Sequence, residues 1–130
     1  MNTVTQVVQA ALIANAALIA VVPALNIMVE GDLQEVQPPY LVHRIVNAEE
    51  TGETHDRGLD TLKFWRYQVA CYATKWSDVD QIAALVRAAL GSYRNNGIAS
   101  HWIGDQAIPY LPDERISQLV CEFKIADMLT

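Results

Sequence analysis

The alternation of apolar and polar side chains near the C-terminus constrains the fold of this chain more than any other feature. Successive side chains of a strand point to opposite faces of a sheet. Between residues 115 and 126, one set is apolar and the other polar: Leu119, Cys121, Phe123 and Ile125 against Gln118, Glu122 and Lys124. The segment is therefore predicted to be a strand with one buried face.

A second long strand is predicted over residues 61–74, which are rich in aromatic side chains. Its more apolar face consists of Trp65, Tyr67, Val69, Cys71 and Ala73. Residues 40–46 follow two prolines and are rich in β-branched side chains, which is typical of a strand. A polar loop over residues 49–60 is expected to join these two strands into a long antiparallel hairpin.

Shorter strands are predicted over residues 27–29 and 98–103. The sequence Asn95-Asn96-Gly97 indicates a turn before the second of them. Residues 104–113 contain two prolines and a glycine, and are predicted to form an irregular connector rather than a strand.

The N-terminal part of the chain is predicted to be helical. Thr3 and Gln6 fit a capping box, which places the start of the first helix at Thr3. Asn15 is expected to end this helix and to cap a second, short helix over residues 16–22, which Pro23 ends.

A third helix is predicted over residues 78–90, with Ser77 as its N-cap and Gly91 as its end. One face of this helix is apolar: Val79, Ile82, Ala83, Val86 and Leu90. The order of elements predicts an α+β fold, with a mostly antiparallel β-sheet that contains a long hairpin and with helices packed on one face. A single domain is expected over residues 1–130.

The composition indicates an apolar surface. The chain is 52% hydrophobic and only 18% charged, which leaves apolar side chains for a protein interface or a membrane. The apolar run of residues 10–25 is shorter than the ~20 residues of a membrane span, and no Lys or Arg precedes Arg44. We therefore expect no membrane segment and no export signal.

The chain is acidic, with a net charge of −6. Proteins that grip a phosphate backbone do so with Lys and Arg, so we expect no tight nucleic-acid binding. An acidic protein that lets DNA pass without holding it remains compatible with this charge.

The sequence contains no recognisable catalytic or metal-binding motif. The histidines His43, His55 and His101 lack ligand spacing, and Cys71 and Cys121 form no CxxC pair. No phosphate loop, dinucleotide fingerprint or nucleophile elbow is present. We therefore predict a non-enzymatic protein without cofactor, in which both cysteines are buried, reduced thiols. The least favoured alternative is a small enzyme that uses His43, Cys71 or His101.

Two groups of residues are candidates for contacts with other molecules. The loop over residues 49–60 is either an inert tip or an acidic docking or pore-lining element; its charged residues are Glu49, Glu50, Glu53, Asp56, Arg57 and Asp60. The candidate subunit contacts are Trp65, Tyr67, Trp102, Tyr110 and Leu111. For the aromatic residues of the long strand, ordinary core packing is the competing interpretation.

The succession of five segments resembles a known family. In chain order they read NAALIAVVP, PPYLVHRIV, LKFWRYQVACYAT, WSDVDQIAALVRAALGSY and RISQLVCEFKIADML. This layout covers nearly the whole chain. It is similar to that of the tail-terminator, or tail-completion, proteins of long-tailed bacteriophages and gene-transfer particles.

The resemblance implies a structural virion protein, assembled in the host cytoplasm and located at the head–tail junction. It implies a ring, commonly a hexamer, that caps the tail tube, stops its polymerisation and joins it to the head connector. The implied partners are copies of the chain, the tail-tube protein and the connector or stopper, with genomic DNA passing through without sequence-specific binding. By position, the loop over residues 49–60 would face the tube or its lumen. The alternative is a neighbouring neck protein, such as a head-completion stopper or adaptor.

Overall fold

The computed structural model describes residues 3–50, 63–95, 97–111 and 116–127. Within these residues the helices are α1 (Thr3–Ala14), α2 (Ala16–Ile19) and α3 (Trp76–Leu90), with a short 3-10 turn at Ala24–Asn26. The strands are β1 (Ile27–Val29), β2 (Tyr40–Glu50), β3 (Lys63–Ala73), β4 (Arg94–Asn95), β5 (Ile98–Leu111) and β6 (Ile116–Asp127).

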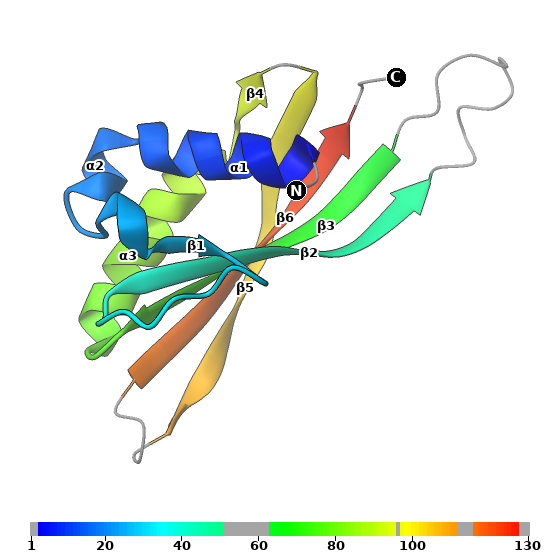
Figure 1. The fold of residues 1–130 in the computed structure, drawn as a ribbon. Helices are drawn as coiled ribbons and strands as arrows, with labels where there is room; N and C mark the ends of the chain where they lie inside the picture. Colours follow the sequence, from blue (N-terminus) through cyan, green and yellow to red (C-terminus); the bar gives the residue numbers. More distant parts are fainter. Residues whose placement is uncertain (1–2, 51–62, 96, 112–115, 128–130) are drawn as a thin grey trace, which may run out of the picture.

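The strands described form one sheet in the order β1-β2-β3-β6-β5-β4 (Figure 1). β1 runs parallel to β2, and all the other neighbours are antiparallel. β2 and β3 pair from Tyr40↔Tyr72 to Glu50↔Lys63. The segment that connects them lies outside the described residues, so the expected hairpin is seen only as this pairing. The predicted α+β fold with a mostly antiparallel sheet is confirmed.

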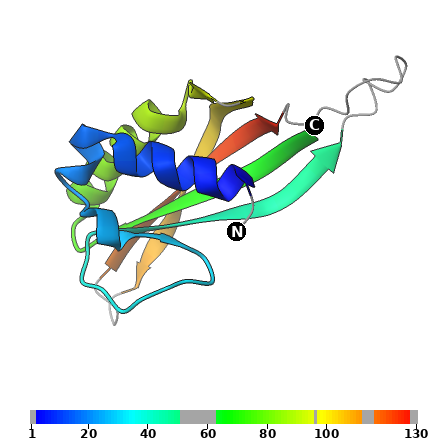
Figure 2. The ribbon, with the colours of Figure 1, turned by 45° about the horizontal axis from the view of Figure 1, so that its top comes forward.

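The helices lie on the same face of the sheet (Figures 1 and 2). α3 packs on β3, β5 and β6, and α1 packs on α3 and β1. The sheet residues beneath the helices are buried: Leu41, Tyr67, Val69, Cys71, Leu119, Cys121, Phe123 and Ile125. They meet Val79, Ile82, Ala83, Val86 and Leu90 of α3. The apolar faces predicted from the alternation of β3 and β6 are therefore the faces that form the core.

The start of α3 differs from the prediction. The helix begins at Trp76, and its N-cap is Lys75, which has an extended backbone and provides no side-chain cap. Ser77 therefore lies inside the first turn, where it cannot act as the N-cap. The helix ends at Leu90, as predicted, and Gly91 adopts a right-handed φ of −63°. Residue 91 therefore does not adopt the left-handed conformation that would favour glycine.

β5 is much longer than expected. We predicted a strand that ends at residue 103 and an irregular connector over residues 104–113, but β5 continues to Leu111. Its register with β6 shifts between Trp102 and Gly104, and again between Ile108 and Leu111. Because these bulges lie near the edge of the sheet, they accommodate Gly104 and Pro109 without ending the strand. β2 likewise extends past its predicted end at residue 46, with a register shift between Ile45 and Asn47.

Asn15 caps α2, as predicted. Its side-chain Oδ1 accepts a hydrogen bond from the backbone N–H of Leu18 at 3.0 Å, although α2 ends at Ile19 rather than at residue 22. We expect Asn15→Ala to lower the free energy of unfolding by about 1 kcal/mol, because the N–H loses its acceptor. Urea denaturation measures this loss, and Asn15→Asp, which keeps the acceptor, serves as the control. Equal stability of the Ala variant and the wild type would contradict the capping role.

Candidate assembly surfaces

His43 is fully buried on β2, beneath α1. Its Nδ1 lies 2.5 Å from the hydroxyl oxygen of Tyr67, and its Nε2 lies 2.5 Å from Oε1 of Gln9 on α1. Thr5, also on α1, forms a hydrogen bond with the Tyr67 side chain. The histidine therefore links the N-terminal helix to β2 and β3.

The hydrogen bonds of Gln9 assign the protonation of the His43 ring. Gln9 Nε2 donates to the carbonyl oxygen of Ile27 at 3.0 Å, so Gln9 Oε1 is the atom that accepts from His43 Nε2–H. His43 Nδ1 then accepts from the Tyr67 hydroxyl. Burial lowers the pKa of His43 to about 4 and raises that of Tyr67, so both groups are neutral at pH 7. With both ring nitrogens engaged, His43 has a structural role.

Cys71 and Cys121 are free thiols, and both are fully buried. A hydrogen bond with Cys121, together with burial, raises the pKa of Cys71. A thiol that stays protonated is a poor nucleophile. The prediction that both cysteines are buried is confirmed. His101 pairs in register with Lys124, and both side chains lie on the face of the sheet opposite to that of Cys71. The structure therefore does not bring His43, Cys71 and His101 together.

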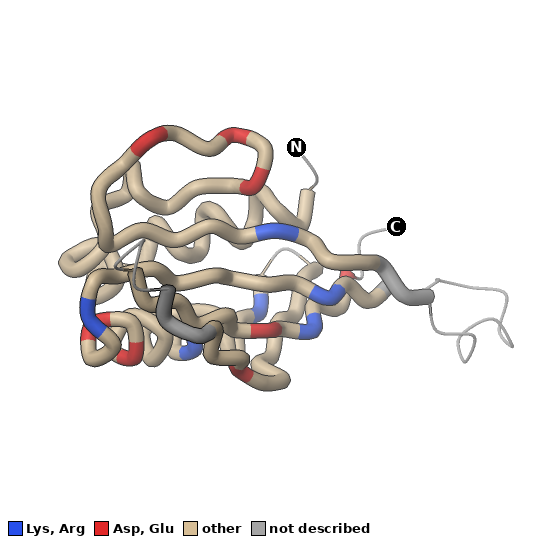
Figure 3. Tube along the Cα trace, turned by 90° about the horizontal axis from the view of Figure 1, so that it is seen from below, with Lys and Arg blue, Asp and Glu red and all other residues tan. Residues whose placement is uncertain are grey.

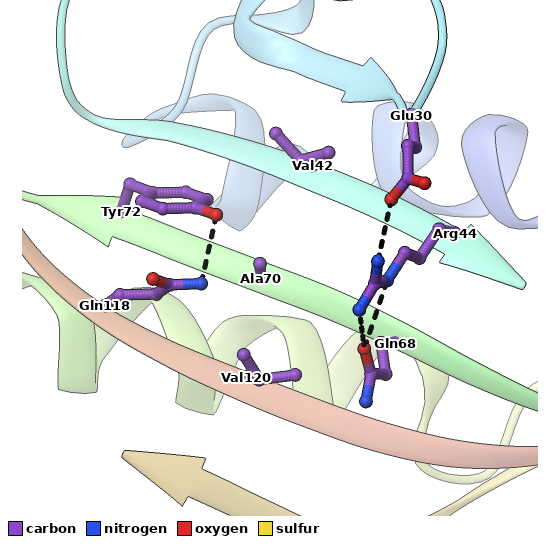
Figure 4. Close-up of a pocket in the computed structure, with 8 residues that line it drawn as sticks. All are labelled: Glu30, Val42, Arg44, Gln68, Ala70, Tyr72, Gln118 and Val120. Carbon is purple, nitrogen blue, oxygen red and sulfur yellow. Dashed lines mark hydrogen bonds and ion pairs between the residues drawn. The ribbon is translucent and has the colours of Figure 1, made fainter. Parts of the chain in front are cut away.

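A row of polar side chains crosses the sheet face that the helices leave open. Arg44 on β2 donates to Glu30 Oε2 at 3.1 Å and to Gln68 Oε1 at 3.0 Å (Figure 4). Gln68 and Arg66 on β3 both donate to the carboxylate of Glu122 on β6, each at 2.9 Å. These bonds lower the pKa of Glu122. Because each charge in the row has a partner, it offers no reactive acid or base.

A hollow of about 150 Å³ lies next to this row. Its floor consists of the small apolar residues Val42, Ala70 and Val120. Tyr72 and Gln118 form one wall, where Gln118 Nε2 donates to the Tyr72 hydroxyl at 3.0 Å (Figure 4). A shallow hollow of this kind can receive an apolar side chain, but it holds no nucleophile.

The β5 edge of the sheet carries an exposed tryptophan whose ring is held in place by polar contacts. Trp102 is 46% exposed, and its Nε1 donates to Asp105 Oδ1 at 2.7 Å. Asp105 also forms an ion pair with Arg87 of α3, whose guanidinium carbon lies 5.8 Å from the centroid of the indole ring. The neighbouring Ile103 is 45% exposed. This edge therefore carries two large apolar side chains, one of which is held by polar contacts.

The opposite edge, at β1, is hollow and apolar. A hollow of about 330 Å³ lies between α1 and β1 and is lined by Ile13, Leu25 and Met28, among others. A second hollow, of about 250 Å³, shares Met28 with it and includes Leu33. Leu25 is 84% exposed and Leu33 58%. Figure 3 shows that acidic residues gather on the loop that follows β1.

The structure places only part of the predicted acidic loop. Glu49 and Glu50 are the last residues of β2 and not loop residues, because β2 pairs with β3 as far as Glu50↔Lys63. The remaining candidates lie outside the described residues: Glu53, Asp56, Arg57 and Asp60.

The aromatic candidates are placed in different surroundings. Tyr67 is fully buried in the core, so it is not accessible to a neighbouring subunit, and we withdraw it as a contact. Trp65 is half-buried on the same face. Trp102 is exposed, as a contact residue must be, and Tyr110 and Leu111 form the end of β5.

Sequence reasoning missed the residues that surround Trp102. Asp105 lies three positions beyond Trp102, but the bulge that brings their side chains together is not visible in the sequence. Arg87 comes from α3 and reaches both through tertiary packing. The exposure of Leu25 and Leu33 was also missed, although their place in a segment rich in turn residues was a usable signal.

Comparison with known proteins assigns the chain to a family. The sequence model described as "Tail completion protein gp17" matches residues 6–126 of the chain. The chain belongs to the tail completion protein family. Among solved structures, the chain is similar in fold to a chain of the "Virion of native gene transfer agent (GTA) particle". The TM-score is 0.72 at 12% identity, over 92% of this chain and 90% of that one. No curated protein matches.

Family membership gives this protein a structural role in the tail of a virion. The family is structural rather than enzymatic in its general role. Among the described residues, no helix has the length and apolar character needed to cross a bilayer. The same residues include no group of three or more His, Cys, Asp or Glu side chains that could hold a metal ion.

Proposed function

We propose that the protein forms a closed ring of six copies at the end of the tail tube. There it stops tube polymerisation and joins the tail to the head connector. The observation that supports this proposal is a sheet with two different unpaired edges. The proposed activity is assembly and needs no catalytic step.

The first unpaired edge belongs to β5. β4 pairs only with Ile98 and Ala99, and the backbone N–H of Ser100 donates to the carbonyl oxygen of Tyr93 at 2.8 Å. Beyond Ser100, no described residue pairs with the outer side of β5. An edge strand of this length is a template for pairing with another chain.

The second unpaired edge is the β1–β2 side of the sheet, where β1 is the outermost strand. β1 pairs only with Leu41, Val42 and His43, and the later part of β2 has no outer strand among the described residues. Contact between two different edges of identical copies is heterologous, and it produces a ring when the rotation closes. A closed ring can end a tube, whereas an open chain of subunits would continue to grow.

The loop that begins after β2 is proposed to face the lumen. It carries Glu53, Asp56 and Asp60 against Arg57 alone. Repulsion between these carboxylates and DNA phosphates would let the genome pass without sticking. The two rims of the ring would then bind the tail-tube protein and the head connector.

Electron microscopy of particles that lack this protein tests the proposal. We expect tails of abnormal length, because tube subunits would continue to add in the absence of a terminating ring. Complementation with the wild-type protein is the control and should restore uniform tails. Tails of normal length that fail to attach to heads would contradict termination and indicate a neck protein instead.

A further inference from the structure

We propose that neighbouring copies join by the β5 edge of one and the β1 edge of the next, with Trp102 seated in the hollow beside Leu25. The partner is a second copy of this chain. This inference rests on the proposed ring and specifies its contact.

Trp102 can be covered by a neighbouring copy without loss of a hydrogen bond. Its indole N–H already has an acceptor in Asp105, so covering the ring leaves no donor unsatisfied. The guanidinium of Arg87 fixes the ring further through a cation–π contact and an ion pair with Asp105. A rigid, half-exposed tryptophan next to an arginine is typical of the few residues that dominate an interface.

The opposite edge has room for this ring. The hollow between α1 and β1 measures about 330 Å³, and Ile13 and Leu25 form part of its apolar lining. Leu25 is 84% exposed in the single protomer, and Leu33, from the adjoining hollow, is 58% exposed. Burial of this apolar surface against a neighbour would remove it from water.

Both surfaces lie on the same side of the sheet. Trp102 pairs in register with Phe123, whose side chain points toward the helices. The hollow is lined by Ile13 of α1, which belongs to the same helical layer. Two copies that stand side by side with their helices on one side therefore bring the indole of one toward the hollow of the other.

The charges of the two edges are complementary. Asp32 and Glu35 follow β1 and form no ion pair with any described residue. Arg94 on β4 is exposed and likewise has no ion pair within the described ranges. Opposite charges favour the contact between unlike edges, and two acidic β1 edges repel each other. The charge pattern therefore favours head-to-tail rings over twofold dimers.

Native mass spectrometry with the tail-tube protein present tests this contact. Trp102→Ala is expected to reduce ring formation about ten-fold or more, because a central anchor is lost. Trp76→Ala is the matched control, since Trp76 is 47% exposed but lies at the start of α3. We expect it to assemble like the wild type. Circular dichroism confirms that both variants are folded.

A covalent test does not depend on the stability of the Trp102 variant. A short bismaleimide should link Leu25→Cys of one copy to Ile103→Cys of the next and give a ladder that ends at the full ring. The native cysteines are buried and do not compete. The proposed contact is wrong if rings form without such a ladder, or if Trp102→Ala assembles like Trp76→Ala. Either result leaves the proposed ring unaffected. If the wild type forms no ring, both proposals fail.

Discussion

Acidification from pH 7 to pH 4 is expected to lower the free energy of unfolding by about 3 kcal/mol through His43 alone. Burial lowers the pKa of this imidazole from 6.5 to about 4. Between these values the unfolded chain binds a proton that the folded chain does not. The stabilisation is therefore complete above pH 6.5 and is lost as the pH falls toward 4.

Urea denaturation at several pH values between 7 and 4 measures this effect. His43→Gln removes the titration, so the fall in stability below pH 6.5 should become shallower than in the wild type. His101→Gln is the control, because His101 is exposed on β5. Carboxylates that titrate between pH 7 and 4 are present in the wild type and in both variants, so they do not affect the comparison. Identical slopes for His43→Gln and the wild type would show that His43 is not a buried neutral residue.

Phe123→Ala is expected to lower the free energy of unfolding by about 3–5 kcal/mol. Phe123 is fully buried on β6, on the face of the sheet beneath the helices. Removal of its ring leaves a cavity that the close-packed core cannot fill. Chemical denaturation gives this value directly.

The other phenylalanine of the chain provides a matched control. Phe64 lies on β3, half-buried on the open face, where the Lys124 ammonium lies 4.5 Å from its ring centroid. We expect Phe64→Ala to cost only about 1 kcal/mol, mostly from the lost cation–π contact. Equal losses for the two variants would contradict a core built on one face of the sheet.

The features that the sequence predicted well are those that depend on local periodicity. Apolar side chains alternate with polar ones in residues 119–125 and 65–73, because burial of one face of a strand imposes a period of two. This alternation predicted that Cys71, Phe123 and Ile125 lie in the core, as they do. The capping role of Asn15 was likewise predictable, since a cap needs only its own backbone neighbours.

The features that were missed depend on tertiary position. Pro109 and Gly104 were interpreted as strand breakers, but bulges near the sheet edge accommodate both. Tyr67 was proposed as a subunit contact, with core packing as the competing interpretation. Its hydrogen bond to His43, which is distant in sequence, places it inside the protomer. The contact between Arg87 and Trp102 could not be predicted either, because it also depends on residues that are distant in sequence.

The mass of the assembly formed with the tail-tube protein tests the central claim most directly. Native mass spectrometry or light scattering of the mixture should detect a closed ring with the mass of six copies, bound to the end of the tube. A protein that stays monomeric both alone and in the presence of tubes, while the tubes continue to lengthen, would contradict the account.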